Sequence, residues 1–293
     1  MSASIALATP RAEAPRSYWA GVRRRLGRDR VTLVCGGILL LMLIAIVAAP
    51  YLAPHLPFQG SMIRRLKPIG FPGYPLGTDE LGRDMLTRLI FGGRLSWIIG
   101  ITPVAIAFLV GGVLGVTAGF VGGGVNMLIM RVTDVFYAFP SVLLAVAISG
   151  ALGSGVSNAI LALTLVFIPP IIRVSESVTT GVRSLDYVEA ARSSGASALT
   201  IVRVHVLPNV LGPIFVYATG LISVSMILAS GLSFLGLGTK PPEPEWGLML
   251  NTLRAAIYTQ PLVSVLPGVC IFITSICFNL LSDGLRTAMD VRN

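Results

Sequence analysis

The sequence has 293 residues, of which 54% are hydrophobic and 12% are charged, about half the charged share of an average soluble domain. A chain of this length with so few charges cannot face water on all sides. Its apolar residues are gathered in long uncharged runs rather than spread at a helical or strand period. These features exclude an ordinary soluble domain and a disordered chain, and they indicate an all-α protein that crosses a membrane several times.

The formal net charge of +9 comes from 22 basic and 13 acidic residues. The tail formed by residues 1–30 holds seven arginines, all of them ahead of the first apolar run: Arg11, Arg16, Arg23, Arg24, Arg25, Arg28 and Arg30. Such a cluster before a first span is typical of the positive-inside rule. It predicts a basic cytoplasmic tail and argues against nucleic-acid binding, for which basic residues along one face or helix are expected.

Six membrane-spanning helices are expected. The first apolar run, residues 31–49, holds 19 uncharged residues, close to the roughly 20 that a helix needs to cross a hydrocarbon core of about 30 Å. This run is too long for the apolar core of a signal peptide. Residues 95–172 carry only two charges, and their length requires three helices separated by glycine-rich turns. With two further apolar runs, the expected spans are 31–53, 95–119, 131–150, 157–175, 210–236 and 262–282, within one membrane domain of residues 31–293.

An even number of spans places both termini on the same side of the membrane. The N-terminal arginines identify that side as the cytoplasm, so residues 120–131, 173–208 and 283–293 are expected there as well. The external segments hold fewer basic residues than the cytoplasmic ones, although the loop 50–94 carries several. The pattern predicts a multi-pass protein of the plasma (inner) membrane with cytoplasmic termini.

Local signals predict how some of these segments are shaped. Thr78 and Asp79 are expected to cap an amphipathic external helix over residues 80–91, and Trp246 suits the membrane interface. Prolines are expected to kink the spans at Pro103, Pro140 and the Pro169-Pro170 pair.

Neither a catalytic nor a metal-binding pattern is present in the sequence. The cysteines Cys35, Cys270 and Cys277 lie inside apolar runs without metal-ligand spacing. His55 and His205 fall in loops on opposite expected sides, and neither HExxH nor GxSxG occurs. The sequence therefore predicts no catalytic residue, no metal and no cofactor, which argues against an intramembrane enzyme.

Energy from an ion gradient or from ATP is also not expected to enter through this chain's own residues. Asp134 is the one acidic residue near a span interior, and Arg131 is expected to pair with it at the membrane interface. A gradient-driven carrier would need acidic residues within its spans. The stretch 231–240 is nearest to a phosphate-binding loop, but Leu237 stands where the motif needs lysine, so ATP and Mg are expected on a different chain.

The polar segment 173–208 lies between two apolar runs and is too charged to cross lipid. Asp186 and Glu189 resemble a capping box at the start of a helix over 187–194, and Gly195 is expected to end that helix in the left-handed conformation. A second helical stretch, 198–206, is expected to stop at Pro208. Such a segment is a solvated connector or a docking site.

The residues of this segment resemble the EAA loop of ABC-importer permeases. Glu189-Ala190-Ala191, Gly195 and Leu207-Pro208 follow the spacing EAAx₃Gx₁₁LP. Four further stretches are similar to the C-type permease of dipeptide, oligopeptide and nickel ABC importers: PLGTDELGRD at 75–84, RVTDVFYAFP at 131–140, SFLGLGTKPPEPEWGLML at 233–250 and FNLLSDGLRTAMD at 278–290. The resemblance extends from about residue 23 to the C-terminus, with Ser282 in place of the family's usual glycine.

This resemblance implies a type I ABC-importer permease fold that forms half of a peptide translocation pathway. The partners that it implies are a homologous second permease, two cytoplasmic ATPase subunits, an external solute-binding protein and membrane lipid. It assigns the ATPase-coupling loop to Asp186, Glu189, Ala190, Ala191, Gly195, Leu207 and Pro208.

The cargo is left open by the sequence. Nickel chelates, glutathione and haem remain alternatives within the class, and a channel or gradient-driven carrier is an alternative outside it. Small polar residues either line a pathway or join helices: Thr164, Ser223, Ser225, Ser230, Thr274 and Asn279.

Overall fold

The computed structural model describes residues 18–289, which form helices and, within that range, only isolated β-bridges. The first half contains α1 (Tyr18–Leu26), α2 (Arg30–Val47), α3 (Ala49–Leu52), α4 (Met85–Val121), α5 (Gly123–Tyr137) and α6 (Ser141–Leu152). The second half contains α7 (Val156–Arg183), α8 (Asp186–Ser193), α9 (Ala198–Ile201), α10 (Leu207–Phe234), α11 (Trp246–Thr252) and α12 (Pro261–Met289). Of the two expected cytoplasmic tails, residues 1–17 and 290–293 lie outside the described part.

The predicted all-helical, polytopic architecture is confirmed. Five described helices are long and apolar enough to cross a membrane: α2, α4, α7, the continuous segment from α9 through α10, and α12. The pair α5 and α6 makes a sixth candidate, but the two are bent by 86°. The expected kink at Pro140 is therefore a sharp break, and the helix before it begins at Gly123 rather than at residue 131. Pro140 is the N-cap residue of α6, and it disfavours helical backbone in the residue before it.

Three helices are longer than the hydropathy pattern indicated. α4 begins at Met85 instead of near residue 95, α7 continues to Arg183 and α12 continues to Met289. The separate external helix over 80–91 is wrong, because Asp84 caps α4 by accepting a hydrogen bond from the Thr87 amide. At 37 residues, α4 is about 55 Å long, so it extends well beyond a hydrocarbon core of about 30 Å.

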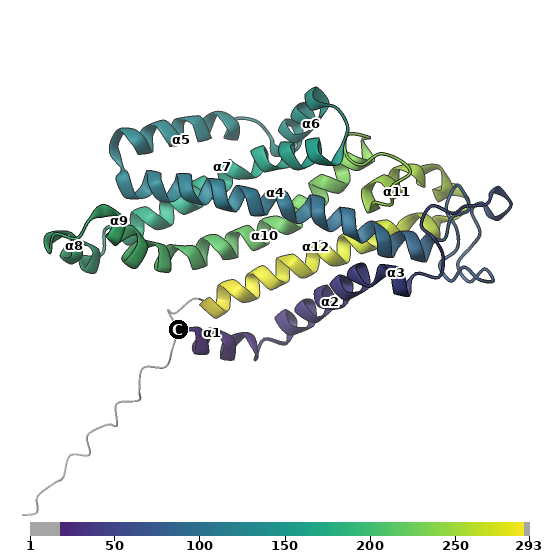
Figure 1. The fold of residues 1–293 in the computed structure, drawn as a ribbon, viewed down its shortest axis with the longest axis horizontal. Coiled ribbons are helices and arrows are strands. Elements are labelled where there is room, and N and C mark those ends of the chain that lie inside the picture. The colour runs from purple at the N-terminus through teal and green to yellow at the C-terminus, as the bar shows by residue number, and fades with distance from the viewer. Residues whose placement is uncertain (1–17, 290–293) are drawn as a thin grey trace, which may run out of the picture.

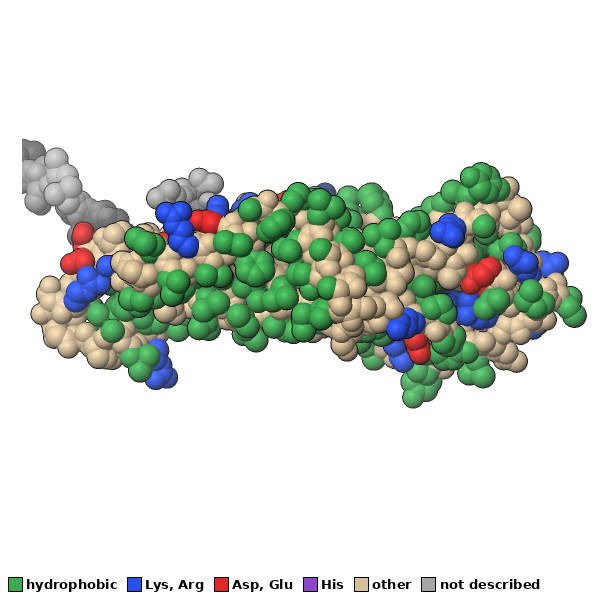
Figure 2. Space-filling view, turned by 90° about the horizontal axis from the view of Figure 1, so that it is seen from above, with side chains coloured by type: hydrophobic (Ala, Val, Ile, Leu, Met, Phe, Trp, Pro, Cys, Tyr) green, Lys and Arg blue, Asp and Glu red, His purple; other side chains and the backbone are tan. Residues whose placement is uncertain are grey.

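The helices form an elongated bundle with different structures at its two ends (Figure 1). α8 and α9 stand at one end, and the irregular segment between α3 and α4 lies at the other. On the face drawn in Figure 2, hydrophobic side chains dominate the middle, and charged side chains gather toward both ends. This distribution matches a membrane protein whose polar groups lie outside the hydrocarbon core.

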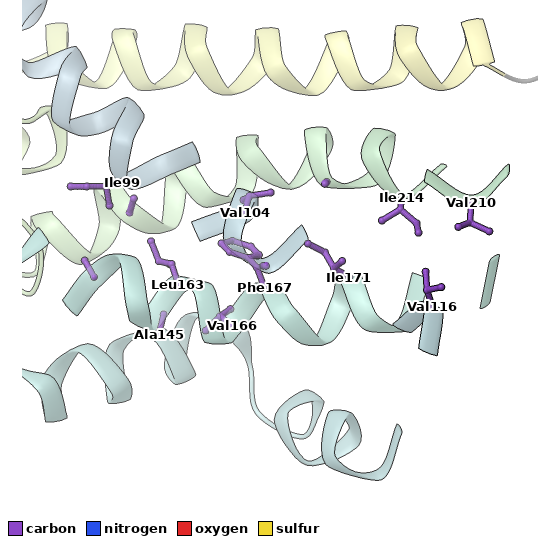
Figure 3. Packing of buried hydrophobic residues seen from close by; sticks show 14 of the residues in the cluster. Ile99, Val104, Val116, Ala145, Leu163, Val166, Phe167, Ile171, Val210 and Ile214 are labelled. Carbon is purple, nitrogen blue, oxygen red and sulfur yellow. The ribbon is translucent and has the colours of Figure 1, made fainter. Parts of the chain in front are cut away.

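The main core is built around the contact between α4 and α7. Glycines at 111, 115 and 119 recur every fourth residue on α4, so they share one face of the helix. At Gly115, a Cβ atom would lie 2.5 Å from the Ile172 carbonyl oxygen, so the helices touch through their backbones. Figure 3 shows side chains of α4, α6, α7 and α10 packed together, with Phe167 near Val104. Small residues permit this approach, as in other membrane helix pairs.

At the end of the bundle opposite α8 and α9, buried charges hold the loop before α4. Asp79 accepts from Arg83 Nε at 2.6 Å and also pairs with Arg88 Nε at 3.2 Å, and all three residues are buried. Trp246 is 1% exposed and donates its indole N–H to the Leu89 carbonyl oxygen. The Trp246 ring is therefore packed inside the bundle rather than against lipid, because α11 folds back against α4.

Candidate functional site

The EAA segment is compact and lies at one end of the bundle (Figure 1). Because α7 continues to Arg183 and α10 begins at Leu207, the part of the expected loop 173–208 that lies between these two helices is residues 184–206. It contains α8, the turn at Gly195, α9 and a π-helical turn at Val202–Val206. The predicted helix over 187–194 agrees closely with α8.

The 184–206 segment is fixed to the bundle by three buried aliphatic side chains. Val188 on α8, Ile201 on α9 and Val206 in the π-helical turn are all at most 2% exposed, and they belong to the main core cluster. The ring of Tyr187 also lies 6.0 Å from that of His205, between centroids, and joins α8 to the π-helical turn. The segment is therefore packed against the core and is not a loose loop.

The predicted capping box is wrong. Leu185 is the N-cap residue of α8 and Asp186 is its first helical residue, so the Asp186 side chain does not cap the helix. The Glu189 carboxylate accepts instead from Arg192 Nη1 at 3.1 Å on an exposed surface. Both acidic side chains lie in the first turn of α8, where they interact favourably with the helix dipole.

The predicted turn at Gly195 is confirmed. Its φ angle is +80°, and it ends α8 in a Schellman motif: the Gly195 amide donates to the Arg192 carbonyl and the Ala196 amide to the Ala191 carbonyl. A Cβ at this position would meet no atom within 4 Å. The requirement for glycine is therefore one of backbone conformation rather than space.

The helix does not stop at Pro208, contrary to the prediction. α9, the π-helical turn and α10 run on as one continuous helix over Ala198–Phe234. The Leu207 amide donates to the Val202 carbonyl, a π-type bond, and this turn lies directly before the proline. Pro208 falls at the start of α10, where its missing N–H is tolerated. A π-type turn within a longer helix is frequently found at functional sites.

The structure divides the seven predicted coupling residues into two groups. Ala191 and Leu207 are half-buried and pack against the core. The other five are exposed: Asp186, Glu189, Ala190, Gly195 and Pro208. The exposed group forms a surface at the end of the bundle that is opposite the segment between α3 and α4 (Figure 1). In the described part of the chain, no group of three or more potential metal ligands occurs.

A groove of about 570 Å³ lies between α10 and α12. Three of the six predicted pathway residues line it: Ser223, Ser230 and Asn279. Thr164, Ser225 and Thr274 lie outside this groove, and Thr274 donates to the Cys270 carbonyl within its own helix. Ser282, the departure from the usual glycine, is buried and donates to the Val216 carbonyl at 2.8 Å, which links α12 to α10.

A second hollow, of about 260 Å³, lies at the break between α5 and α6. Residues of α7 and α10 complete its lining, including the Pro169-Pro170 pair. Beside it, Asp134 accepts from Arg173 Nη2 at 2.7 Å, so the predicted pair with Arg131 is wrong. Sequence reasoning missed this pair because α5 and α7 approach each other only in the folded bundle.

The fold is that of an ABC-importer permease. It matches inward-facing crystal structures of the MetNI methionine ABC transporter with a TM-score of 0.58 at 19% identity, covering 70% of this chain and 97% of that one. An amino acid ABC transporter matches with a TM-score of 0.52 at 15% identity, covering 68% of this chain and 92% of the other.

Sequence comparison defines the family. Residues 111–293 match the binding-protein-dependent transport system inner membrane component, and residues 17–68 match the N-terminal TM domain of oligopeptide transport permease C. The glutathione transport system permease protein GsiD of Pectobacterium atrosepticum is 41% identical over 276 residues, or 94% of this chain and 91% of that protein. The di/tripeptide transport system permease protein DppC of Pseudomonas aeruginosa is 42% identical over 262 residues, which are 87% of this chain and 86% of that protein.

The chain therefore belongs to the family of binding-protein-dependent inner membrane permeases, in its oligopeptide permease C branch. The resemblance drawn from the EAA loop and the four further stretches is confirmed. As a permease subunit of an ABC importer, the protein is a multi-pass component of the inner membrane that works with ATPase subunits. It has no catalytic site or cofactor of its own.

Proposed function

We propose that this chain forms one half of a pathway for short peptides and that its 184–206 segment receives the movement of the ATPase subunits. The observation that carries the coupling role is the construction of this segment. It lies at one end of the bundle with an exposed surface, yet Val188, Ile201 and Val206 anchor it in the core. A partner that pushes on its exposed face moves α7 and α10 together, because the segment joins these two helices.

The names of the relatives support a peptide cargo. One relative is described as a permease for glutathione and the other for di- and tripeptides. Glutathione is itself a modified tripeptide, so both descriptions refer to short peptides with free carboxylates. Nickel chelates and haem remain alternative cargoes within the same class of importer.

The remaining partners in the proposal are a homologous second permease and an external solute-binding protein. The groove between α10 and α12 leaves surface for the second permease. The loop between α3 and α4 lies at the end opposite the 184–206 segment (Figure 1), which suits contact with a binding protein. Both termini are assigned to the cytoplasm, together with this segment.

The test of coupling uses Gly195. A valine at a φ of +80° costs roughly 1–2 kcal/mol or more, and it changes the exit of the chain from α8. In vesicles that contain the whole importer, we expect Gly195→Val to insert and assemble normally. Transport of a labelled dipeptide and ATP hydrolysis stimulated by the loaded binding protein should both fall severalfold.

Gly195→Asn is the matched control, because asparagine tolerates the left-handed conformation far better than valine. It should retain most of the transport. Glu189→Ala removes the exposed partner of Arg192 and should give a milder defect of the same kind. Normal transport by Gly195→Val at normal expression would contradict the coupling role, and an importer that takes up no peptide would contradict the cargo.

A further inference from the structure

The ion pair between Asp134 and Arg173 is placed unusually for a membrane helix surface. Asp134 belongs to α5 and Arg173 to α7, which are both parts of candidate spans. Arg173 lies about ten residues, or roughly 15 Å along the axis, before the end of α7. Yet the two side chains are 46% and 47% exposed, respectively. The ion pair is therefore exposed on the surface of helices that belong to candidate spans.

A half-exposed ion pair is not stable against lipid tails. Ionisable residues within spans almost always face a bundle interior or a water-filled cavity, and they mark pathways for ions or substrates. The groove between α10 and α12 carries no charged side chain among its lining residues. The hollow at the α5–α6 break has no charged lining residue either, so the Asp134–Arg173 pair itself is the observation that favours water on the α5–α7 face.

The Arg173 guanidinium is held in a fixed orientation but is only partly used. Its Cζ atom lies 4.3 Å from the centre of the Tyr137 ring, so the side chain rests on the aromatic face. Nη2 donates to Asp134, and the other nitrogens have no hydrogen-bond partner among the described residues. A planar guanidinium with free donors and a stacked face is suited to bind a carboxylate.

An apolar hollow lies beside this guanidinium. Tyr137, which supports Arg173, is also one of the residues that line the 260 Å³ hollow at the α5–α6 break. Phe139 and Phe167 line the same hollow. Its size suits one side chain rather than a whole peptide. A cation beside a small aromatic hollow fits the carboxylate and the last side chain of a peptide.

We propose that Arg173, supported by Tyr137 and restrained by Asp134, is a carboxylate-binding station on the water-facing wall of the translocation pathway. This inference rests on the proposed peptide function and names the residue that meets the cargo. Asp134 competes with the cargo for the guanidinium, which keeps the binding weak enough for the peptide to leave. Removal of the Asp134 charge should therefore strengthen the binding, whereas removal of the Arg173 charge should abolish it.

The test places a cysteine in the hollow of the assembled importer, in a chain whose three native cysteines are replaced by alanine. Phe139→Cys reports on the hollow, since Phe139 is 57% exposed. Leu41→Cys is the matched control: Leu41 is 68% exposed on α2, away from the ion pair. A charged, water-soluble thiol reagent is applied with and without ATP. The ligands are alanylphenylalanine and its C-terminal amide.

We expect the thiol reagent to label only the first variant: Phe139→Cys should react and Leu41→Cys should not. Alanylphenylalanine should protect Phe139→Cys at concentrations at least about tenfold lower than its amide, as a charge-assisted hydrogen bond implies. Arg173→Gln should remove this difference, and Asp134→Asn should increase it. If Arg173→Gln does not assemble, Arg173→Lys carries the test, with a difference smaller than that of the parent.

Several results would overturn the proposal. One is a Phe139→Cys variant that is as unreactive as Leu41→Cys, and another is equal protection by alanylphenylalanine and its amide. A third is an equal loss of protection in Asp134→Asn and Arg173→Gln, because that result would indicate that the ion pair is purely structural. Dipeptide uptake by the parent importer is measured in parallel. Uptake without carboxylate-dependent protection refutes the station and leaves the peptide function standing, whereas absence of uptake refutes the peptide function itself.

Discussion

Replacement of Gly115 by alanine should weaken the contact between α4 and α7. The new Cβ atom would lie 2.5 Å from the Ile172 carbonyl oxygen and 2.5 Å from the Ser175 Cβ atom, whereas ordinary contacts begin at 3.4 Å. The conflict involves backbone and Cβ atoms, so it cannot be relieved by a change of rotamer. The two helices must move apart by a substantial part of 1 Å, and overpacking of this kind costs roughly 1–3 kcal/mol.

Gly112 on the same helix provides the matched control. A Cβ atom there meets nothing within 4 Å, and Gly112→Ala gains the same helix propensity of about 1 kcal/mol that Gly115→Ala gains. The difference between the two variants therefore isolates the contact. At roughly 2–4 °C per kcal/mol for a chain of this size class, Gly115→Ala should melt several degrees below Gly112→Ala.

The assay is thermal unfolding of the purified chain in detergent, followed by tryptophan fluorescence. Both variants are prepared in the same detergent and compared by their melting midpoints. Equal midpoints, or a higher midpoint for Gly115→Ala, would refute the inference that backbone contact between α4 and α7 requires glycine at position 115.

The remaining predictions concern the loops and the orientation of the chain. Asp79→Asn should destabilise the fold by roughly 3–5 kcal/mol, because buried Arg88 loses its charged partner and buried Arg83 keeps only Glu80; a smaller melting shift and unchanged protease resistance of the loop would count against this. Burial raises the pKa of the Glu245 carboxyl group above its ordinary value of 4.5, so the folded chain binds the carboxyl proton more tightly than the unfolded chain does. The contribution of this proton to the free energy of unfolding is complete below the ordinary pKa and is lost as pH rises through the raised pKa. Glu245→Gln should remove that fall, and an identical pH profile in the variant would disprove it. Cysteines placed at Ile63 and Ser193 should react with an impermeant thiol reagent only from outside and only from inside, respectively; the reverse would invert the topology. The purified chain alone should hydrolyse no ATP until its ATPase partners are added, and turnover by a pure preparation would contradict this.

Some of the fold and the site follow directly from the sequence, because they depend on local chemistry. The long uncharged runs require helices in lipid, since every backbone polar group must find its partner within the same segment. The turn at Gly195 was predictable because a left-handed residue after a short helix strongly favours glycine. The spacing of Glu189, Gly195 and Pro208 carried the family resemblance.

Other features depend on contacts between distant segments. The sequence indicates a kink at Pro140, but the 86° bend and the hollow that residues of α7 and α10 line beside it are found only in the fold. The regular glycines at 111, 115 and 119 were visible in the sequence, yet only the fold shows that they face α7. Trp246 looks like an interfacial residue until α11 folds back to bury it.

The sequence by itself determined the class of protein and the place of the EAA segment, because hydropathy and turn chemistry act within a few residues of each position. The tertiary structure decided which charges meet. Asp134 has an arginine three residues away on its own helix, but its partner is Arg173 on α7, because helix packing brings that guanidinium within 2.7 Å. The partner of a charge is a property of the packed bundle, which no local pattern encodes.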